Sequence, residues 1–155
     1  MVDPEIIFGE AHLTKWGANV IDTAFEQALK TLEPTFKDRL RRLPAENGDA
    51  ESSGALASVL PLHTEEVELL ARVAGRYSLP LEALGAGTAP GTIAVERSIL
   101  VRFDLMRGMR LPHSGKGWAE AEPGIPWLNL DNKLHQRGMG LTVYPTSAPR
   151  ATVGG

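Results

Sequence analysis

The segment from residue 57 to residue 105 constrains the fold most, because short apolar runs alternate with one amphipathic helix. Residues 58–62 form a short apolar run typical of a buried strand. Residues 98–105 are expected to form a second strand, with Val101, Phe103 and Leu105 facing one way. From residue 57 onward the pattern is a strand–helix–strand–strand series, which predicts one β-α-β crossover followed by a further strand (a β-α-β-β unit) in an α+β or α/β fold.

The helix of this crossover is expected from Thr64 to about Tyr77. Thr64 can cap it, Glu65 and Glu66 suit the positive end of its dipole, and Pro80 prevents its continuation. Its apolar residues recur at helical spacing: Val67, Leu70, Ala71 and Ala74. Residues 81–84 are too few for another helix and lead into a glycine-rich stretch.

The N-terminal part has a helical character of its own. Its stripe of apolar residues comprises Ile21, Phe25, Ala28, Leu29 and Leu32. A second short helix is expected from Pro34, with Phe36, Leu40 and Leu43 on one side. Arg39, Arg41 and Arg42 are then most simply a solvated face, and a basic docking patch is the alternative. Residues 44–54 have the composition of a linker. We therefore expect a helical appendage and linker over residues 1–55 and a main unit over 56–155.

The last third of the chain shows shorter patterns. Residues 118–122 alternate like a strand, and residues 126–136 have helical spacing that Gly138 would close as the C′ residue. Residues 141–144 are expected to form another short strand. Residues 145–149 are expected to turn away from it.

Composition limits the classes of function. With 155 residues, of which 43% are hydrophobic and 23% charged, the chain is long enough for one globular domain. A net charge of -3 argues against nucleic acid as a partner. Without cysteine, redox chemistry would have to come from a bound cofactor. The sequence shows no signal peptide and no apolar run long enough to span a bilayer, so a cytoplasmic location is expected.

The glycine-rich stretch at residues 84–92 is the main candidate site. Gly85, Gly87 and Gly91 allow positive φ and close approach of a ligand, so that successive N–H groups can converge on a phosphate. The alternative is a plain β-turn between two strands. A dinucleotide-binding Rossmann loop is disfavoured, because the third glycine comes four residues after the second and a strand follows. The segment 114–117 fails as a Walker motif, since no Ser or Thr follows Lys116.

No other constellation predicts chemistry. The four histidines are scattered, without a metal-ligand spacing: His12, His63, His113 and His135. The helix dipole explains Glu65 and Glu66, and the solvent side of a strand explains Glu120 and Glu122. No metal site and no catalytic triad are therefore expected.

Taken together, the segments resemble the FAD-binding domain of the PCMH-type, or vanillyl-alcohol-oxidase, flavoprotein family over about residues 60–155. The matching segments are residues 61–67 (PLHTEEV), 78–81 (SLPL, with Ser78 for the usual Gly), 85–88 (GAGT, with Gly91 as the later glycine), 105–109 (LMRGM), 123–127 (PGIPW), 145–147 (PTS) and 152–155 (TVGG). Each match is weak alone, but their order and spacing make the resemblance specific.

The resemblance implies an FAD site in two parts. The loop residues Gly85, Ala86, Gly87, Thr88, Ala89, Pro90 and Gly91 would cradle the FAD pyrophosphate through backbone N–H groups. The later residues Pro145, Thr146, Ser147, Thr152, Val153, Gly154 and Gly155 would line the flavin-side groove. Some relatives attach FAD covalently through a histidine near this loop, and none lies between Leu84 and Thr92. FAD is therefore expected to be non-covalent, or attached through a residue outside this chain.

By the same resemblance, the full protein would oxidise an alcohol or a 2-hydroxy acid by hydride transfer to FAD. Catalytic residues of the family lie mainly in a substrate domain, so none is assigned here. The family's domain continues past the Gly-Gly step, so the sequence is expected to be a fragment or one piece of a split protein. Two alternatives remain: a non-catalytic α+β interaction module, and a subunit that completes its flavin site with another chain.

Overall fold

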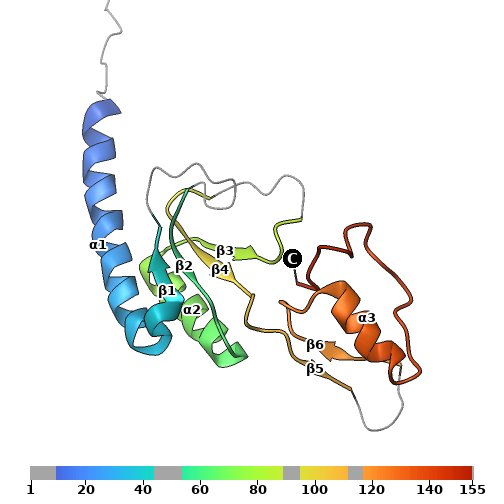
Figure 1. The fold of residues 1–155 in the computed structure, drawn as a ribbon. Helices are drawn as coiled ribbons and strands as arrows, with labels where there is room; N and C mark the ends of the chain where they lie inside the picture. The colour runs from blue at the N-terminus through green and yellow to red at the C-terminus, as the bar shows by residue number, and fades with distance from the viewer. Residues whose placement is uncertain (1–9, 44–53, 89–94, 112–116, 155) are drawn as a thin grey trace, which may run out of the picture.

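The computed structural model describes residues 10–43, 54–88, 95–111 and 117–154, and Figure 1 shows their arrangement. They form a sheet with two helices packed on it and a smaller second lobe that begins after the sheet. Within the described residues, no helix is both long and apolar enough to cross a membrane. The predicted α+β fold is confirmed.

The main sheet has four strands in the order β1-β2-β4-β3. Its strands are β1 Leu40–Arg42, β2 Ala55–Val59, β3 Leu81–Leu84 and β4 Ser98–Arg102. β4 lies between β2 and β3 and is parallel to both, whereas β1 pairs antiparallel with β2. The helix α2, Thr64–Tyr77, connects β2 to β3 across the sheet. The predicted β-α-β crossover is therefore present.

Both central strands differ in extent from the prediction. β2 covers residues 55–59 instead of 58–62, because Pro61 has no N–H for a sheet ladder and the Leu60 N–H donates to the Arg39 carbonyl (3.0 Å). β4 stops at Arg102 instead of residue 105. Beyond it the chain turns, and the Met106 N–H donates to the Phe103 carbonyl (3.0 Å).

Helix α2 has the predicted bounds but not the predicted cap. Thr64 is the first residue of the helix and not its N-cap. The N-cap residue is His63, and its side chain makes no capping hydrogen bond. Instead, the Glu66 carboxylate accepts from the Leu62 N–H just before the helix (2.7 Å). Leu70 and Ala74 are buried as expected, together with Val73, whereas Ala71 is exposed.

The predicted second helix after Pro34 is wrong. Helix α1 runs from Glu10 to Phe36 with Pro34 inside its last turn, and a 3₁₀ turn, η1 Lys37–Arg39, follows. Lys37 has φ 50°, a left-handed conformation that ends the helix. Leu40–Arg42 then form β1, because pairing with the free edge of β2 satisfies their backbone groups.

One hydrophobic core joins α1 and α2 to the sheet. Its fully buried members include Leu32 and Phe36 from α1, Leu70 from α2, and Val59 and Ile99 from the sheet. The N-terminal segment thus packs into the same core as the crossover. The division of the chain at residue 55 stays a prediction.

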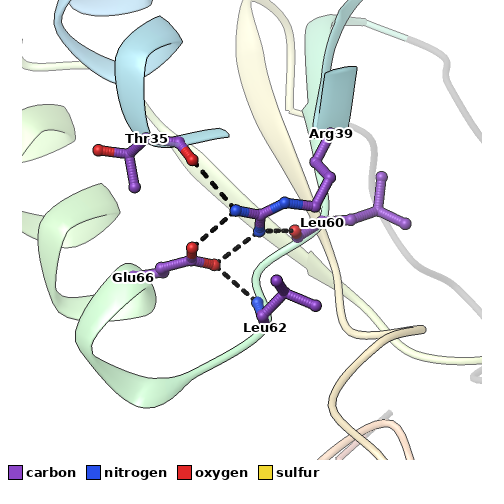
Figure 2. A network of polar contacts seen from close by, with 5 residues as sticks. All are labelled: Thr35, Arg39, Leu60, Leu62 and Glu66. Carbon is purple, nitrogen blue, oxygen red and sulfur yellow. Dashed lines mark hydrogen bonds and ion pairs between the residues drawn. The ribbon is translucent and has the colours of Figure 1, made fainter. Parts of the chain in front are cut away.

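An ion pair fixes the junction of η1 with the start of α2 (Figure 2). Both Arg39 guanidinium NH groups donate to the Glu66 carboxylate at 2.7 Å, and they also reach the carbonyls of Leu60 (2.8 Å) and Thr35 (3.1 Å). The two side chains are only 18% and 15% exposed. Arg39 therefore does not belong to a solvated face. Arg42, the last residue of β1, also pairs with a carboxylate, that of Glu26 (2.5 Å).

The second lobe contains two short strands, β5 Met109–Arg110 and β6 Glu120–Ala121, and the helix α3, Trp127–His135. Ile125, Leu130 and Leu134 form its core. The predicted strand at 118–122 shrinks to two residues. The predicted helix is confirmed within one residue at each end, and Gly138 follows it with φ 70°.

The predicted strand at 141–144 is wrong, because this segment bonds to α3. The Leu141 N–H donates to Asp131 Oδ1 (3.3 Å). A hydrogen bond from Tyr144 to Asp131 lowers the pKa of Asp131 and raises that of Tyr144. The Asp131 carboxylate on α3 therefore takes the place of a neighbouring strand as the hydrogen-bond partner of this segment.

The C-terminal segment packs against the turn before α3. The Val153 N–H donates to the Ile125 carbonyl (3.0 Å) and the Gly154 N–H to the Pro123 carbonyl (2.9 Å). A Cβ on Gly154 would lie 2.4 Å from Pro123 Cβ and 2.8 Å from its Cα. Only glycine fits this approach.

We expect Arg39→Ala to lower the free energy of unfolding by about 2 kcal/mol, because it leaves the largely buried Glu66 carboxylate without its partner. Urea unfolding measures the change. Arg41→Ala, at an exposed position on β1, is the matched control and should change stability by less than about 0.5 kcal/mol. Equal effects of the two variants would contradict a stabilising role of the ion pair.

The same pair predicts a pH dependence. The hydrogen bonds from Arg39 lower the pKa of Glu66 below its ordinary value of 4.5. The pair therefore stabilises the fold above pH 4.5, and this contribution is lost as the pH falls through the lowered pKa. Glu66→Gln should be less stable than the wild type at pH 7, and the difference should shrink below pH 4.5. A difference that stays constant with pH would contradict this assignment.

We expect Gly154→Ala to lower the free energy of unfolding by about 2 kcal/mol, because the added methyl group overlaps Pro123. Gly140→Ala is the control, since its Cβ would meet only the His135 ring at 3.7 Å. Thermal unfolding compares the two variants. An unchanged Tm for Gly154→Ala would show that the turn can move aside.

Candidate cofactor site

The glycine loop begins at the carboxyl end of β3. Leu84 is the last residue of the strand, a bend follows at Gly85 to Gly87, and Gly87 has φ 65°. The Phe103 N–H, at the end of the neighbouring β4, donates to the Leu84 carbonyl (3.3 Å). The carboxyl ends of two parallel strands therefore lie together, which is where α/β sheets commonly bind ligands.

The second predicted segment forms a compact turn. The Ala148 N–H donates to the Pro145 carbonyl (3.0 Å), and the Ala151 N–H donates to the Ser147 carbonyl (2.8 Å). Ala148 and Ala151 are buried, at 5% and 2% exposure. Because the buried Ala148 and Ala151 anchor this turn, the polar side chains of the neighbouring residues remain at the surface.

A hydrogen bond joins the two segments. The Ala86 N–H of the glycine loop donates to the Thr152 hydroxyl (3.2 Å), across 66 positions of sequence. In Figure 1 the end of the chain comes back to the region after β3. Thr152 thus connects the first lobe to the second.

A cavity of about 570 Å³ lies between the two segments. Its described lining residues are Ala86, Gly87, Thr88, Thr146, Ser147, Pro149 and Arg150. The structure therefore brings together five of the predicted site residues from both parts of the proposed site. The sequence analysis missed Pro149 and Arg150, although they lie between the two quoted motifs, PTS and TVGG.

The other predicted residues are not in the lining. Val153 packs against the core of the second lobe, Gly154 packs on Pro123, and Gly85 and Pro145 lie outside the cavity wall. Ala89, Pro90, Gly91 and Gly155 lie outside the described residues. Val153 and Gly154 shape the segment that carries Thr152.

The chemistry of the described lining suits an anionic, hydroxyl-rich ligand. It offers three hydroxyls, the backbone of a glycine turn and one guanidinium, and none of these seven residues carries a carboxylate. None of them can act as a general base of ordinary pKa. The arrangement can bind and orient a phosphate-bearing ligand.

Titratable groups elsewhere have structural partners. Glu120 pairs with Arg110, and Glu122 accepts from the Gly108 N–H, so these carboxylates do more than face solvent. Asp131 faces His135 at 3.1 Å. Among the described residues, no three His, Asp or Glu side chains gather as a metal ion requires.

Comparison with known proteins gives consistent results. The family model described as "FAD binding domain" matches residues 55–155. A mitochondrial D-lactate dehydrogenase [cytochrome] of Arabidopsis thaliana is 28% identical over 99 residues, covering 63% of this chain and 17% of the relative. An uncharacterized FAD-linked oxidoreductase of Mycobacterium tuberculosis is 31% identical over 87 residues, covering 55% and 19%. The chain thus spans less than a fifth of these relatives.

Solved structures share the fold. An alkyldihydroxyacetonephosphate synthase superimposes with a TM-score of 0.71 at 21% identity, covering 83% of this chain and 28% of the other. The 4-ethylphenol oxidase from Gulosibacter chungangensis gives 0.63 at 21% identity, covering 79% and 26%. The expected fold and cofactor family are confirmed: the chain belongs to the FAD-binding domain family of flavin-dependent oxidoreductases.

Proposed function

We propose that this chain binds FAD non-covalently in the cavity between the glycine loop and residues 145–152. It would serve as part of a flavoprotein that oxidises an alcohol or a 2-hydroxy acid. When bound, FAD supplies the acceptor for a hydride. The likeness to the Arabidopsis D-lactate dehydrogenase supports a hydroxy acid as the substrate class.

One observation carries this proposal: the cavity unites two segments that lie about 60 positions apart in the sequence. A plain β-turn after β3 would need no such partner. The link from Ala86 to Thr152 holds the two walls together, so the pocket belongs to the folded chain. Membership of the FAD-binding family also argues against a non-catalytic interaction module.

The residues of the cavity would have distinct roles. Gly87, with its positive φ, lets the loop backbone approach a diphosphate without a side chain in between. The hydroxyls of Thr88, Thr146 and Ser147 can donate to phosphate or ribityl oxygens.

Catalytic turnover would also need substrate-binding side chains, and the described residues place none in the cavity. Within the described part, β3 has no partner on its outer side, and such an edge invites a further strand. We propose that additional polypeptide, in the same chain or in another subunit, completes the flavin site and supplies the substrate-binding residues.

Purified protein should bind added FAD. At about 100 times the Kd, binding contributes about 2.7 kcal/mol, which raises Tm by roughly 5 to 10 °C in a domain of this size. A flavin absorbance that stays with the protein through gel filtration is the second readout. If neither signal appears, the chain by itself is not a competent FAD site.

Gly87→Ala should weaken FAD binding about tenfold, because a side chain at positive φ strains the cradle. Gly138→Ala is the matched control, since Gly138 has φ 70°, close to the φ 65° of Gly87, but lies outside the cavity. Both variants should lose similar stability, and only Gly87→Ala should lose FAD affinity. Equal FAD affinities of the two variants would place the cofactor elsewhere.

A further inference from the structure

Arg150 differs from the other residues of the cavity because it carries the single charge among the described lining residues. Five other arginines pair with carboxylates: Arg39, Arg42, Arg72, Arg102 and Arg110. Within the described part of the chain, the Arg150 guanidinium has no such partner. Its charge therefore remains available to a ligand.

The backbone holds Arg150 at the cavity. Its N–H donates to the Ser147 carbonyl (2.9 Å), and the next residue, Ala151, is 2% exposed. The Ala151 carbonyl also accepts from the Trp127 N–H at the start of α3 (3.1 Å). Because the turn is anchored on both sides, the Arg150 side chain starts from a fixed point on the cavity wall.

The chemistry of this position favours a phosphate ligand. A guanidinium presents a planar fork of donors that matches phosphate oxygens and stays charged at any physiological pH. The lining residues Thr88, Thr146 and Ser147 add hydroxyl donors to the same cavity. No carboxylate among the described lining residues would repel the anion or compete for the arginine.

We propose that Arg150 is a cofactor-binding residue that contacts the diphosphate of FAD from the 145–151 turn, while the glycine loop contributes backbone donors. This inference rests on the proposed FAD site and adds a side-chain charge to a site otherwise made of neutral groups. A guanidinium can also stack on a ring. Stacking on the flavin is the rival arrangement, and an uncharged ligand distinguishes the two.

The test compares Arg150→Gln and Arg150→Lys with Arg137→Gln, an exposed arginine after α3 that is not in the cavity lining. Calorimetric titration of the full chain measures the Kd for FAD, for ADP and for riboflavin, which has no phosphate. We expect Arg150→Gln to weaken FAD and ADP about tenfold and to leave riboflavin unchanged. Arg150→Lys should restore part of the affinity, and Arg137→Gln should match the wild type.

Salt provides an independent readout. FAD binding to the wild type should weaken with ionic strength more steeply than binding to Arg150→Gln, because one charge contact is missing in the variant. The Tm values without ligand should agree among the variants, which confirms that the fold is intact.

The outcomes separate the two proposals. If the wild type binds FAD and Arg150→Gln binds it equally well, the role of Arg150 is overturned and the FAD site stands. If riboflavin affinity falls as much as FAD affinity, Arg150 stacks on the flavin, and the diphosphate contact is overturned. If the wild type binds no FAD, the proposed function fails, and the inference fails with it.

Discussion

The parallel pairing of β3 with β4 determines where this protein can hold a ligand. Parallel strands place their carboxyl ends at one edge of the sheet, and here both chain segments leave that edge side by side. The glycine loop leaves β3 there, and the second lobe begins beyond β4. Because the lobe starts beside the loop, its last residues can return to Ala86 through Thr152.

The packing of the second lobe holds its C-terminal segment in place beside the glycine loop. Ile125, Leu130 and Leu134 give it a small core, and the backbone of residues 151–154 bonds to the start of α3 and the turn before it. Gly154 allows that close approach to Pro123. These contacts fix the position of the segment that faces the glycine loop. The shape of the cavity therefore depends on the core of the second lobe, which does not itself line the cavity.

The first lobe gains rigidity from charges as well as from its core. The Arg39 guanidinium joins the end of α1, the end of β2 and the first turn of α2. Such a bidentate pair, largely shielded from water, specifies one arrangement of these three elements. The N-terminal helix and β1 thus pack with the crossover, although the family match begins only at residue 55.

Sequence patterns alone predicted α2, a strand beginning at Ser98, a short strand around residues 120–121 and α3, because helical periodicity, prolines and glycines act locally. They did not predict β5, whose two residues form a strand only by pairing with β6. Tertiary structure decided what depends on distant partners. Residues 40–42 became a strand because β2 offered an edge, and residues 141–144 did not because Asp131 offered an acceptor. The cavity and the place of Arg150 in it depend on two segments that meet only in the folded chain, so no local pattern could reveal them.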